Sequence, residues 1–326
     1  MLEFGSMLPQ NTEDYSIIRQ VAQKSEKLGF DSVWLYDHLY PYNAPLGSPC
    51  YEIWTTLSAL AEATSKIRLG TLVLCNSFRY PSIVAKMVST LDNISQGRIE
   101  VGIGSGWYKE EFDAYGIPFS DPASRTESLR DGIQIMRKMW TEEKATYRGK
   151  YHWIESAYSS PKPLQKPYPP LWVGGTYPPV LRITAEFADG WNIAFYPSNT
   201  PDGFARKVRV LDRYCREVGR DPNTLRKSWA GQIVLAETET EVNRKVAKLK
   251  PSGMSLDEYK VARIIGTPDE CLNQIQDYAE RGASYFMFGF PQAEKLEPLE
   301  LFARTVLARA RKIGDRGDGT DYAGPA

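Results

Sequence analysis

The sequence of 326 residues is poor in histidine and cysteine. It contains two histidines and four cysteines, and the cysteines, at positions 50, 75, 215 and 271, have no paired spacing. A structural zinc site needs several such ligands at close spacing, and a disulfide framework needs paired cysteines in an oxidising compartment. We therefore expect no metal site, no disulfide, and reduced thiols in a cytoplasmic protein.

An excess of one charge and long apolar runs are also missing. Lysine plus arginine and aspartate plus glutamate both number 40, so there is no basic field to attract nucleic acid or an anionic membrane. No window approaches the roughly 18 apolar residues of a membrane span, and no basic segment followed by an apolar stretch opens the sequence. These absences predict a soluble, unsecreted protein whose partner is a small molecule.

What the chain does have is an alternation of strand and helix signals. Hydrophobic residues make up 42% of the sequence, which is enough to bury a large core. Apolar runs that end in polar or glycine-rich turns predict strands at residues 2–9, 31–38, 67–74, 98–105, 171–175, 190–195, 227–236 and 285–290. Helical periodicity predicts helices at residues 15–28, 52–64, 81–95, 125–140, 179–188, 202–218, 239–249, 267–281 and 296–313.

Two stretches interrupt this alternation. Residues 142–170 are rich in proline and predict an excursion or a short hairpin after the fourth strand. Residues 250–265 look irregular and are expected to form a second excursion before the eighth strand. Eight strands, each followed by a helix and joined without a linker, predict a (β/α)8 TIM barrel that spans residues 1–313 as one domain. A doubly wound sheet is the alternative. Residues 314–326, without an apolar period, predict a disordered tail.

In such a barrel the functional groups lie at the carboxyl ends of the strands. Few residues there are charged, which suits a planar aromatic ligand. The clearest chemical feature is the pair Asp37-His38, because histidine titrates near neutral pH and a nearby carboxylate can hold its tautomer for acid–base catalysis. The alternative is that His38 only bonds a backbone carbonyl. His152, beside Trp153 in the proline-rich stretch, is expected to be structural.

Glycines mark two other strand ends. Gly174-Gly175-Thr176 precedes a predicted helix and could bind a phosphate, although a plain tight turn is the alternative. The alternating glycines at 102, 104 and 106 lie within a strand and open no helix, so they are not a dinucleotide-binding fingerprint. Trp107 follows them at a position where an aromatic ring could pack on a ring-shaped ligand.

These motifs together resemble one family over nearly the whole chain. The matching segments, in order, are residues 30–38 (FDSVWLYDH), 69–72 (LGTL), 78–81 (FRYP), 90–98 (TLDNISQGR), 102–107 (GIGSGW) with 110–112 (EEF), 115–118 (YGIP), 170–175 (PLWVGG), 188–192 (ADGWN) and 265–268 (IGTP). The sequence resembles the bacterial luciferase-like superfamily. Within it, the sequence is most similar to the branch that depends on the deazaflavin coenzyme F420.

The resemblance implies a TIM barrel, a cofactor across its C-terminal face, and a homodimer. It implies a non-proline cis peptide at Leu72-Val73 that packs behind the cofactor ring. It further implies that Asp37 and His38 line that ring, that Cys75 and Asn76 lie beside it, and that Ser105, Gly106 and Trp107 form the next wall. Gly174, Gly175 and Thr176 match the phosphate-binding loop. One position departs from the pattern of the F420-dependent branch. The sugar-phosphate dehydrogenases of that branch carry a glutamate, which acts as an acid, at the position where this sequence has Ser105. The difference counts against a substrate of the glucose 6-phosphate type.

The expected activity is hydride transfer between C5 of coenzyme F420 and a small organic substrate. His38 would supply or accept the balancing proton, and Asp37 would orient it. Two alternatives stand beside this expectation. One is a monooxygenase dependent on flavin mononucleotide (FMN) and molecular oxygen, and the other is a flavin-binding barrel without catalysis.

Overall fold

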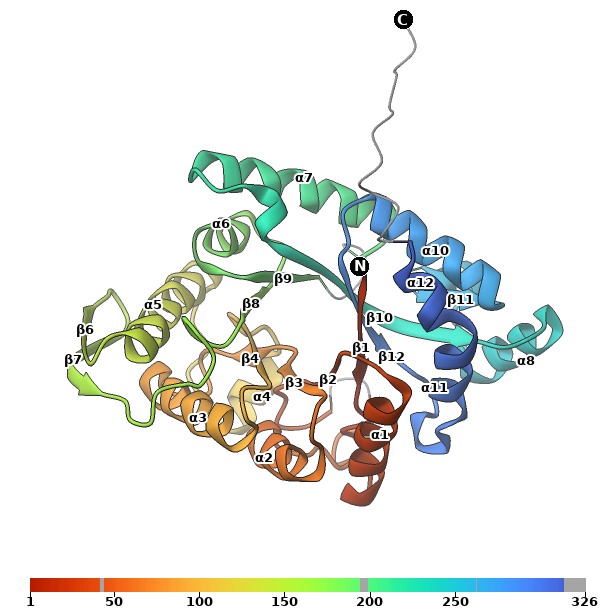
Figure 1. Ribbon diagram of the computed structural model, residues 1–326, viewed down its shortest axis with the longest axis horizontal. Coiled ribbons are helices and arrows are strands. Elements are labelled where there is room, and N and C mark those ends of the chain that lie inside the picture. The colour runs from red at the N-terminus through yellow and green to blue at the C-terminus, as the bar shows by residue number, and fades with distance from the viewer. Residues whose placement is uncertain (42–43, 194–198, 262, 314–326) are drawn as a thin grey trace, which may run out of the picture.

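In the computed structural model, which describes residues 1–41, 44–193, 199–261 and 263–313, parallel strands close into a ring with helices outside it (Figure 1). The ring runs from β12 through β1, β2, β3 with β4, β5, β8 and β9 to β10, which pairs with both β9 and β12. The predicted (β/α)8 barrel is therefore confirmed. The strands of the main sheet are β1 (Glu3–Met7), β2 (Ser32–Leu35), β3 (Arg68–Thr71), β4 (Leu74–Cys75), β5 (Ile99–Gly104), β8 (Leu171–Gly174), β9 (Gly190–Ile193), β10 (Arg226–Leu235), β11 (Arg263–Gly266) and β12 (Tyr285–Gly289).

The helices surround this ring. They are α1 (Tyr15–Leu28), α2 (Ile53–Ala63), α3 (Pro81–Ile94), α4 (Lys109–Ala114), α5 (Pro122–Thr141), α6 (Pro178–Phe187), α7 (Pro201–Glu217), α8 (Glu239–Leu249), α9 (Leu256–Lys260), α10 (Pro268–Glu280), α11 (Glu297–Phe302) and α12 (Ala308–Arg311), with two short 3-10 helices, η1 (Pro222–Thr224) and η2 (Ala293–Lys295). A π-helical segment, η3 (Ala303–Leu307), joins α11 to α12. Among the described helices, none combines the length and the apolar character needed to cross a membrane.

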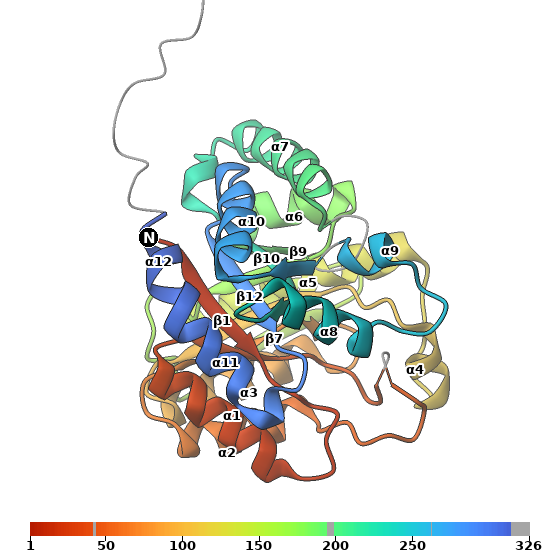
Figure 2. The same ribbon diagram turned by 90° about the vertical axis from the view of Figure 1, so that its right-hand side faces the viewer.

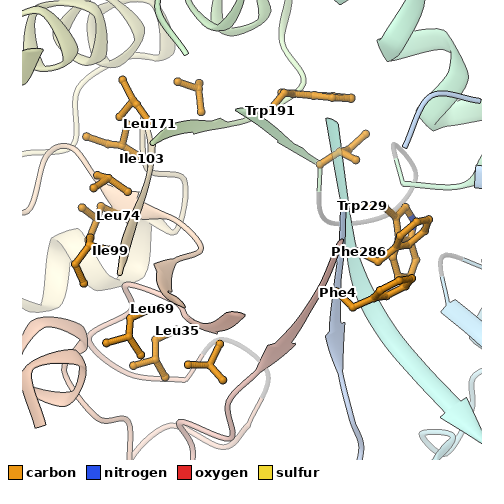
Figure 3. Close-up of a cluster of buried hydrophobic side chains, with 14 of the residues drawn as sticks. Phe4, Leu35, Leu69, Leu74, Ile99, Ile103, Leu171, Trp191, Trp229 and Phe286 are labelled. Carbon is orange, nitrogen blue, oxygen red and sulfur yellow. The ribbon is translucent and has the colours of Figure 1, made fainter. Parts of the chain in front are cut away.

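The main core lies between the strands and the helices. Alternate side chains of each strand point outward from the ring, as Figure 3 shows for Phe4, Leu69 and Phe286. The rings of Phe4 and Phe286, on neighbouring strands, stack at 5.7 Å between centroids. The outward alternation follows from the geometry of a strand. Because the inward-facing side chains are buried as well, several strands are buried along their whole length and read as continuous apolar runs in the sequence.

A second set of side chains fills the inside of the barrel. Trp34, Trp172 and Tyr285 form a buried aromatic cluster there. Glycines make room for it, because a Cβ atom at Gly70 would lie 2.1 Å from the Trp34 ring and one at Gly190 would lie 2.2 Å from the Trp172 ring. The barrel is thus packed below the ends of the strands, so ligands bind above this layer.

The first interruption of the alternation is a hairpin. Strands β6 (Lys144–Arg148) and β7 (Trp153–Tyr158) pair antiparallel, which confirms the hairpin expected within residues 142–170. The carboxylate of Asp131 on α5 ties it down by accepting hydrogen bonds from the Tyr147 hydroxyl (2.9 Å) and from the backbone N–H of Tyr151 (2.7 Å). Figure 1 shows the hairpin against α5, at the edge of the barrel.

The second interruption is more regular than we expected. Residues 250–265 contain α9 and β11, and β11 pairs in parallel with the end of β10, from Gln232 to Leu235. The segment lies outside the eight-strand ring, as expected of an excursion, but the expectation that it is irregular was wrong. β10 is ten residues long and extends beyond its ring neighbours, so its free edge recruits β11. Figure 2 shows α8 and α9 beside this extension. The predicted tail, residues 314–326, and the last residues of the strand predicted at 190–195 lie outside the described residues.

Candidate active site

The carboxyl ends of the barrel strands border one open cavity of about 2040 Å³. Eleven of the twelve residues proposed from the sequence line it: Asp37, His38, Leu72, Val73, Cys75, Ser105, Gly106, Trp107, Gly174, Gly175 and Thr176. They come from four segments that are far apart in the chain. The barrel brings them together because parallel strands place all of their carboxyl ends on one face.

Val73 forms the floor of this cavity between β3 and β4. The peptide bond between Leu72 and Val73 is cis, as the resemblance implied. The methyl groups of Val73 face Gly104 and Gly174, where an added Cβ would lie 3.0 and 2.9 Å from them. At Gly102 an added Cβ would lie 2.1 Å from the backbone oxygen of Thr71. The alternating glycines therefore allow the backbone of β5 to approach the irregular segment between β3 and β4.

Cys75 follows this segment and is buried. Burial, reinforced by the negative charge of Asp37, raises the pKa of the Cys75 thiol to about 12. An added Cβ at Gly106 would lie 2.6 Å from the sulfur, so only glycine leaves room for it. The thiol is therefore a neutral packing group, because nucleophilic cysteines need a lowered pKa.

Asn76 is the one proposed site residue that does not line the cavity. Its side-chain amide donates a hydrogen bond to Ser128 Oγ on α5 (3.0 Å), and Ser128 Oγ lies 2.8 Å from His152 Nε2. The expectation that Asn76 faces a cofactor is therefore wrong. Successive side chains of an extended segment point to opposite sides, so Cys75 and Asn76 cannot both face the cavity. His152 has the structural surroundings that were expected, between α5 and the ring of Tyr80.

His38 lies in the cavity wall and is held by a carboxylate from α4. Its Nδ1 atom lies 2.8 Å from Oε1 of Glu111, whose side chain is 1% exposed. The same oxygen accepts a hydrogen bond from the backbone N–H of Leu39 (3.0 Å). With Nδ1 held in this way, neutral His38 carries its proton on Nδ1 and its lone pair on Nε2. The arrangement is that of an acid–base group with a fixed orientation.

Asp37 has a different partner from the one we expected. Its Oδ2 atom accepts hydrogen bonds from the guanidinium of Arg79 (2.8 Å) and from the backbone N–H of Cys75 (2.9 Å). Arg79 also binds Glu52, the residue that caps the start of α2, at 2.7 Å. Burial raises the pKa of the Asp37 carboxyl, and Arg79 opposes part of that rise. The prediction that Asp37 orients His38 is therefore wrong: Asp37 ties β2 to the segment after β4, and Glu111 orients the imidazole.

Aromatic rings surround His38. Its ring makes edge contacts with Tyr36 (5.4 Å between centroids), Trp107 (5.9 Å) and Tyr108 (6.0 Å), and Trp107 stacks on Tyr108 at 5.2 Å. Trp107 is 53% exposed at the rim of the cavity. A half-exposed tryptophan beside a titratable group gives the wall an apolar surface that suits an organic ligand.

Comparison with known proteins shows to which family the chain belongs. The family model described as luciferase-like monooxygenase matches residues 1–263. The chain belongs to this family. It is 30% identical over 337 aligned residues to the F420-dependent glucose-6-phosphate dehydrogenase of Intrasporangium calvum, an alignment that covers 95% of this chain and 97% of that protein.

Solved structures of other oxidoreductases share the fold. The coenzyme F420-dependent tetrahydromethanopterin reductase of Methanopyrus kandleri superposes with a TM-score of 0.79 at 22% identity, covering 94% of this chain and 99% of that one. The monooxygenase RslO1 of Streptomyces bottropensis also reaches a TM-score of 0.79, at 24% identity and with the same coverage. At such identities the likeness establishes the barrel.

Three residues of this luciferase-like site carried no role in the sequence analysis. Glu111 was part of a matching motif, but nothing in Glu110-Glu111 indicates which carboxylate turns inward. Arg79 was likewise part of a motif, and its charge gave no sign of its partner. Lys207 lines the cavity from α7, where the sequence shows it only as one of two adjacent cations on an amphipathic helix. Helix orientation, which the packing decides, distinguishes these residues from their neighbours.

Proposed function

We propose that the chain transfers a hydride between coenzyme F420 and a small organic substrate, with His38 supplying or accepting the balancing proton. The observation that carries this proposal is the bond between His38 Nδ1 and Glu111 Oε1, in the wall of a cavity whose floor is Val73. A buried carboxylate that fixes the orientation of an imidazole beside a ligand cavity is an arrangement suited to proton transfer between the imidazole and the ligand.

The residues of the floor fit a flat, uncharged ring system. Gly104 and Gly174 present no side chains there, and a Cβ at either position would collide with Val73. Cys75 is neutral, and the carboxylate of Asp37 is paired with Arg79. A planar ring can therefore rest on backbone and methyl groups without burying an unpaired charge.

A bound deazaflavin would supply the redox chemistry, by accepting or donating a hydride at its C5 atom. The chain's own residues manage the proton and the position of the reactants. Glu111 holds Nδ1 of His38, so that Nε2 is the atom that would exchange the proton with the substrate, and the carboxylate stabilises the imidazolium while it exists. Tyr36 and Trp107 border the imidazole with apolar surface, which limits the access of water.

The choice of coenzyme F420 over FMN is supported by relatives. The dehydrogenase of I. calvum, similar over 95% of this chain, is named for its dependence on F420, and so is the reductase of M. kandleri. The FMN monooxygenase is the second candidate, because RslO1 shares the fold equally well. A binding barrel without catalysis is the third, and the His38–Glu111 pair counts against it, because such a protein needs no oriented imidazole.

Titration of the purified protein with F420 and FMN, each oxidised and reduced and followed by fluorescence, tests the choice of coenzyme. We expect binding of F420. Binding of FMN alone would refute the proposal and favour the monooxygenase. Single-turnover mixing of the F420 complex with small alcohols, ketones and sugar phosphates then tests hydride transfer, because the absorbance of the coenzyme reports its redox state.

We also propose that two copies of the chain associate through α2 and α3. These helices border a shallow groove of about 240 Å³ lined by Trp54, Ile83, Met87 and Ile94. Ile83 is 57% exposed, and the indole N–H of Trp54 is buried without a hydrogen-bond partner. An exposed apolar face of this kind supports a homodimer.

A further inference from the structure

The loop that joins β5 to α4 carries two aromatic residues, Trp107 and Tyr108, which form an aromatic wall of the cavity. The chain reaches this position through Gly106, whose φ is +77°, and an added Cβ there would lie 2.6 Å from the sulfur of Cys75. Glycine adopts such a conformation without strain. The indole of Trp107 stacks on the Tyr108 ring at 5.2 Å between centroids, and Trp107 is still 53% exposed. A large apolar ring therefore remains open to a ligand at the rim of the cavity.

Tyr108 stands at a position where the start of a helix favours other residues. It is the N-cap residue of α4, and its side chain makes no capping hydrogen bond. Serine, threonine, aspartate and asparagine are preferred there, because their side chains accept a hydrogen bond from the first turn. An aromatic ring takes the place of such a cap, and this ring supports the indole of Trp107.

The Tyr108 ring is itself supported by two other tyrosines. Tyr40 makes an edge contact with it at 5.8 Å between centroids, and the ring of Tyr115, which follows α4, lies 6.3 Å from that of Tyr40. The hydroxyl of Tyr115 donates a hydrogen bond to the backbone oxygen of Leu39 at 3.2 Å. The aromatic wall is thus held in place by neighbouring side chains, so a ligand that stacks on it has few side chains to order.

The aromatic wall adjoins the acid–base group. The centroids of Trp107 and Tyr108 lie 5.9 and 6.0 Å from that of His38. A flat group that stacks on the indole would therefore lie beside the imidazole. The buried carboxylate of Glu111, 2.8 Å from His38 Nδ1, disfavours a second negative charge in this place.

The cations that line the cavity are held by other partners. Besides His38, the described residues of the lining include three of them: Arg125, Lys207 and Arg263. Their side chains contact, in the same order, the ring of Phe119, the backbone oxygen of Thr176 and the ring of Tyr259. None of these contacts involves the aromatic wall, so the wall suits an uncharged group better than a phosphate or a carboxylate.

We infer that the aromatic wall binds the substrate, and that the substrate carries a planar, uncharged aromatic group. The chemical class is an aryl ketone or aldehyde, or the corresponding alcohol, whose ring stacks on Trp107 and whose oxygen faces His38. The assignment of this ligand as the substrate rests on the proposed function. The stacking surface itself rests on the positions of Trp107 and Tyr108 and on the tyrosines that support them.

Three ketones that differ in planarity or charge test this inference: acetophenone, cyclohexyl methyl ketone and 4-acetylbenzoate. Their dissociation constants are measured by NMR titration, with oxidised F420 bound and without coenzyme, for the native protein, Trp107→Ala, Trp107→Phe and Trp153→Ala. We expect the native protein to prefer acetophenone to each of the other two by about 3- to 10-fold. Trp107→Ala should lose the preference over the saturated ring, and Trp107→Phe should retain most of it. Trp153→Ala, at a tryptophan of similar exposure on β7, should retain all of it.

The titrations without coenzyme separate this inference from the proposed function. If neither F420 nor FMN binds, the proposed function is wrong, and these titrations still decide the role of Trp107. Equal binding of all three ketones by the native protein, or an unchanged preference for acetophenone in Trp107→Ala, would overturn the inference. So would a Trp107→Ala variant that loses affinity for the coenzyme and keeps its affinity for acetophenone, because the indole would then contact the coenzyme ring.

Discussion

Oε1 of Glu111 lies 2.8 Å from Nδ1 of His38, across an interval of 73 residues. The bond joins α4 to the end of β2 and gives the imidazole one orientation. Because the same carboxylate oxygen accepts a backbone N–H from Leu39, the carboxylate is itself fixed. An oriented acid–base group is then available at the cavity without any movement of the chain.

The first prediction concerns this pair. His38→Ala should lower kcat by about 10²–10⁴-fold, because it removes the group that exchanges the proton. Glu111→Gln should lower kcat by about tenfold or more and change the dissociation constant of the coenzyme little, because it affects the orientation and charge of the imidazole. The measurement is turnover with a substrate found among small alcohols, ketones and sugar phosphates. Glu110→Gln, at the exposed neighbour, is the control, and full turnover of Glu111→Gln would contradict the assigned role.

The second prediction concerns the floor of the cavity. Gly174→Ala places a Cβ 2.9 Å from a methyl group of Val73 and should destabilise the protein by about 1–3 kcal/mol. Combination with Val73→Ala should recover part of this loss, because the colliding methyl groups are removed. Urea unfolding of the single and double variants measures the coupling.

Gly102→Ala is the matched control for this cycle. Its Cβ would lie 2.1 Å from the backbone oxygen of Thr71, which Val73→Ala leaves in place. The second substitution should therefore recover little of the loss at Gly102. Equal recovery at both glycines would show that Val73 is not the neighbour that requires glycine at 174.

The third prediction concerns pH and Glu26 on α1. Partial burial opposes ionisation of this side chain, but hydrogen bonds from the backbone N–H groups of residues 65–67 outweigh it and lower the pKa of Glu26. A carboxyl whose pKa is lowered by folding stabilises the protein at pH values above its ordinary pKa. This contribution is lost as the pH falls through the lower pKa of the folded state. Glu26→Gln should therefore cost about 1 kcal/mol at neutral pH and reduce the loss of stability between about pH 5 and pH 3.

Denaturant unfolding at a series of pH values measures this contribution. Glu13→Gln, at an exposed position before α1, should leave the pH dependence unchanged. A free energy of unfolding in Glu26→Gln that keeps the native dependence on pH would show that the hydrogen bonds to Glu26 do not contribute.

The fourth prediction concerns the face of α2 and α3. Ile83→Glu should convert the proposed dimer into a monomer, because the change places charge in a surface that association would bury. Light scattering coupled to size exclusion measures the mass. Leu256→Glu, at another exposed apolar position, should leave the mass unchanged. A native protein that is monomeric at all concentrations would refute the dimer.

The sequence by itself determined the architecture and most of the cavity wall. Short apolar runs that end in polar or glycine-rich turns, and helices that end on glycine, are local signals, so the barrel strands could be placed without any knowledge of their neighbours. β11 was the exception, because it is a strand only through pairing with the projecting end of β10. The position of the cavity at the strand ends, with residues 37–38, 75, 105–107 and 174–176, followed from that order. Leu72 and Val73 were added by the resemblance to the luciferase-like family.

The tertiary structure alone decided which side chains act together. The neighbours Asp37 and His38 form hydrogen bonds with different partners, Arg79 and Glu111, because adjacent residues at a strand end point in different directions. For the same reason, Cys75 lines the cavity while the side chain of its neighbour Asn76 points away from it. Lys207 reaches Thr176 only because α7 packs beside the loop before α6. Partners of this kind are set by packing between elements distant in the chain, which local patterns in the sequence do not encode.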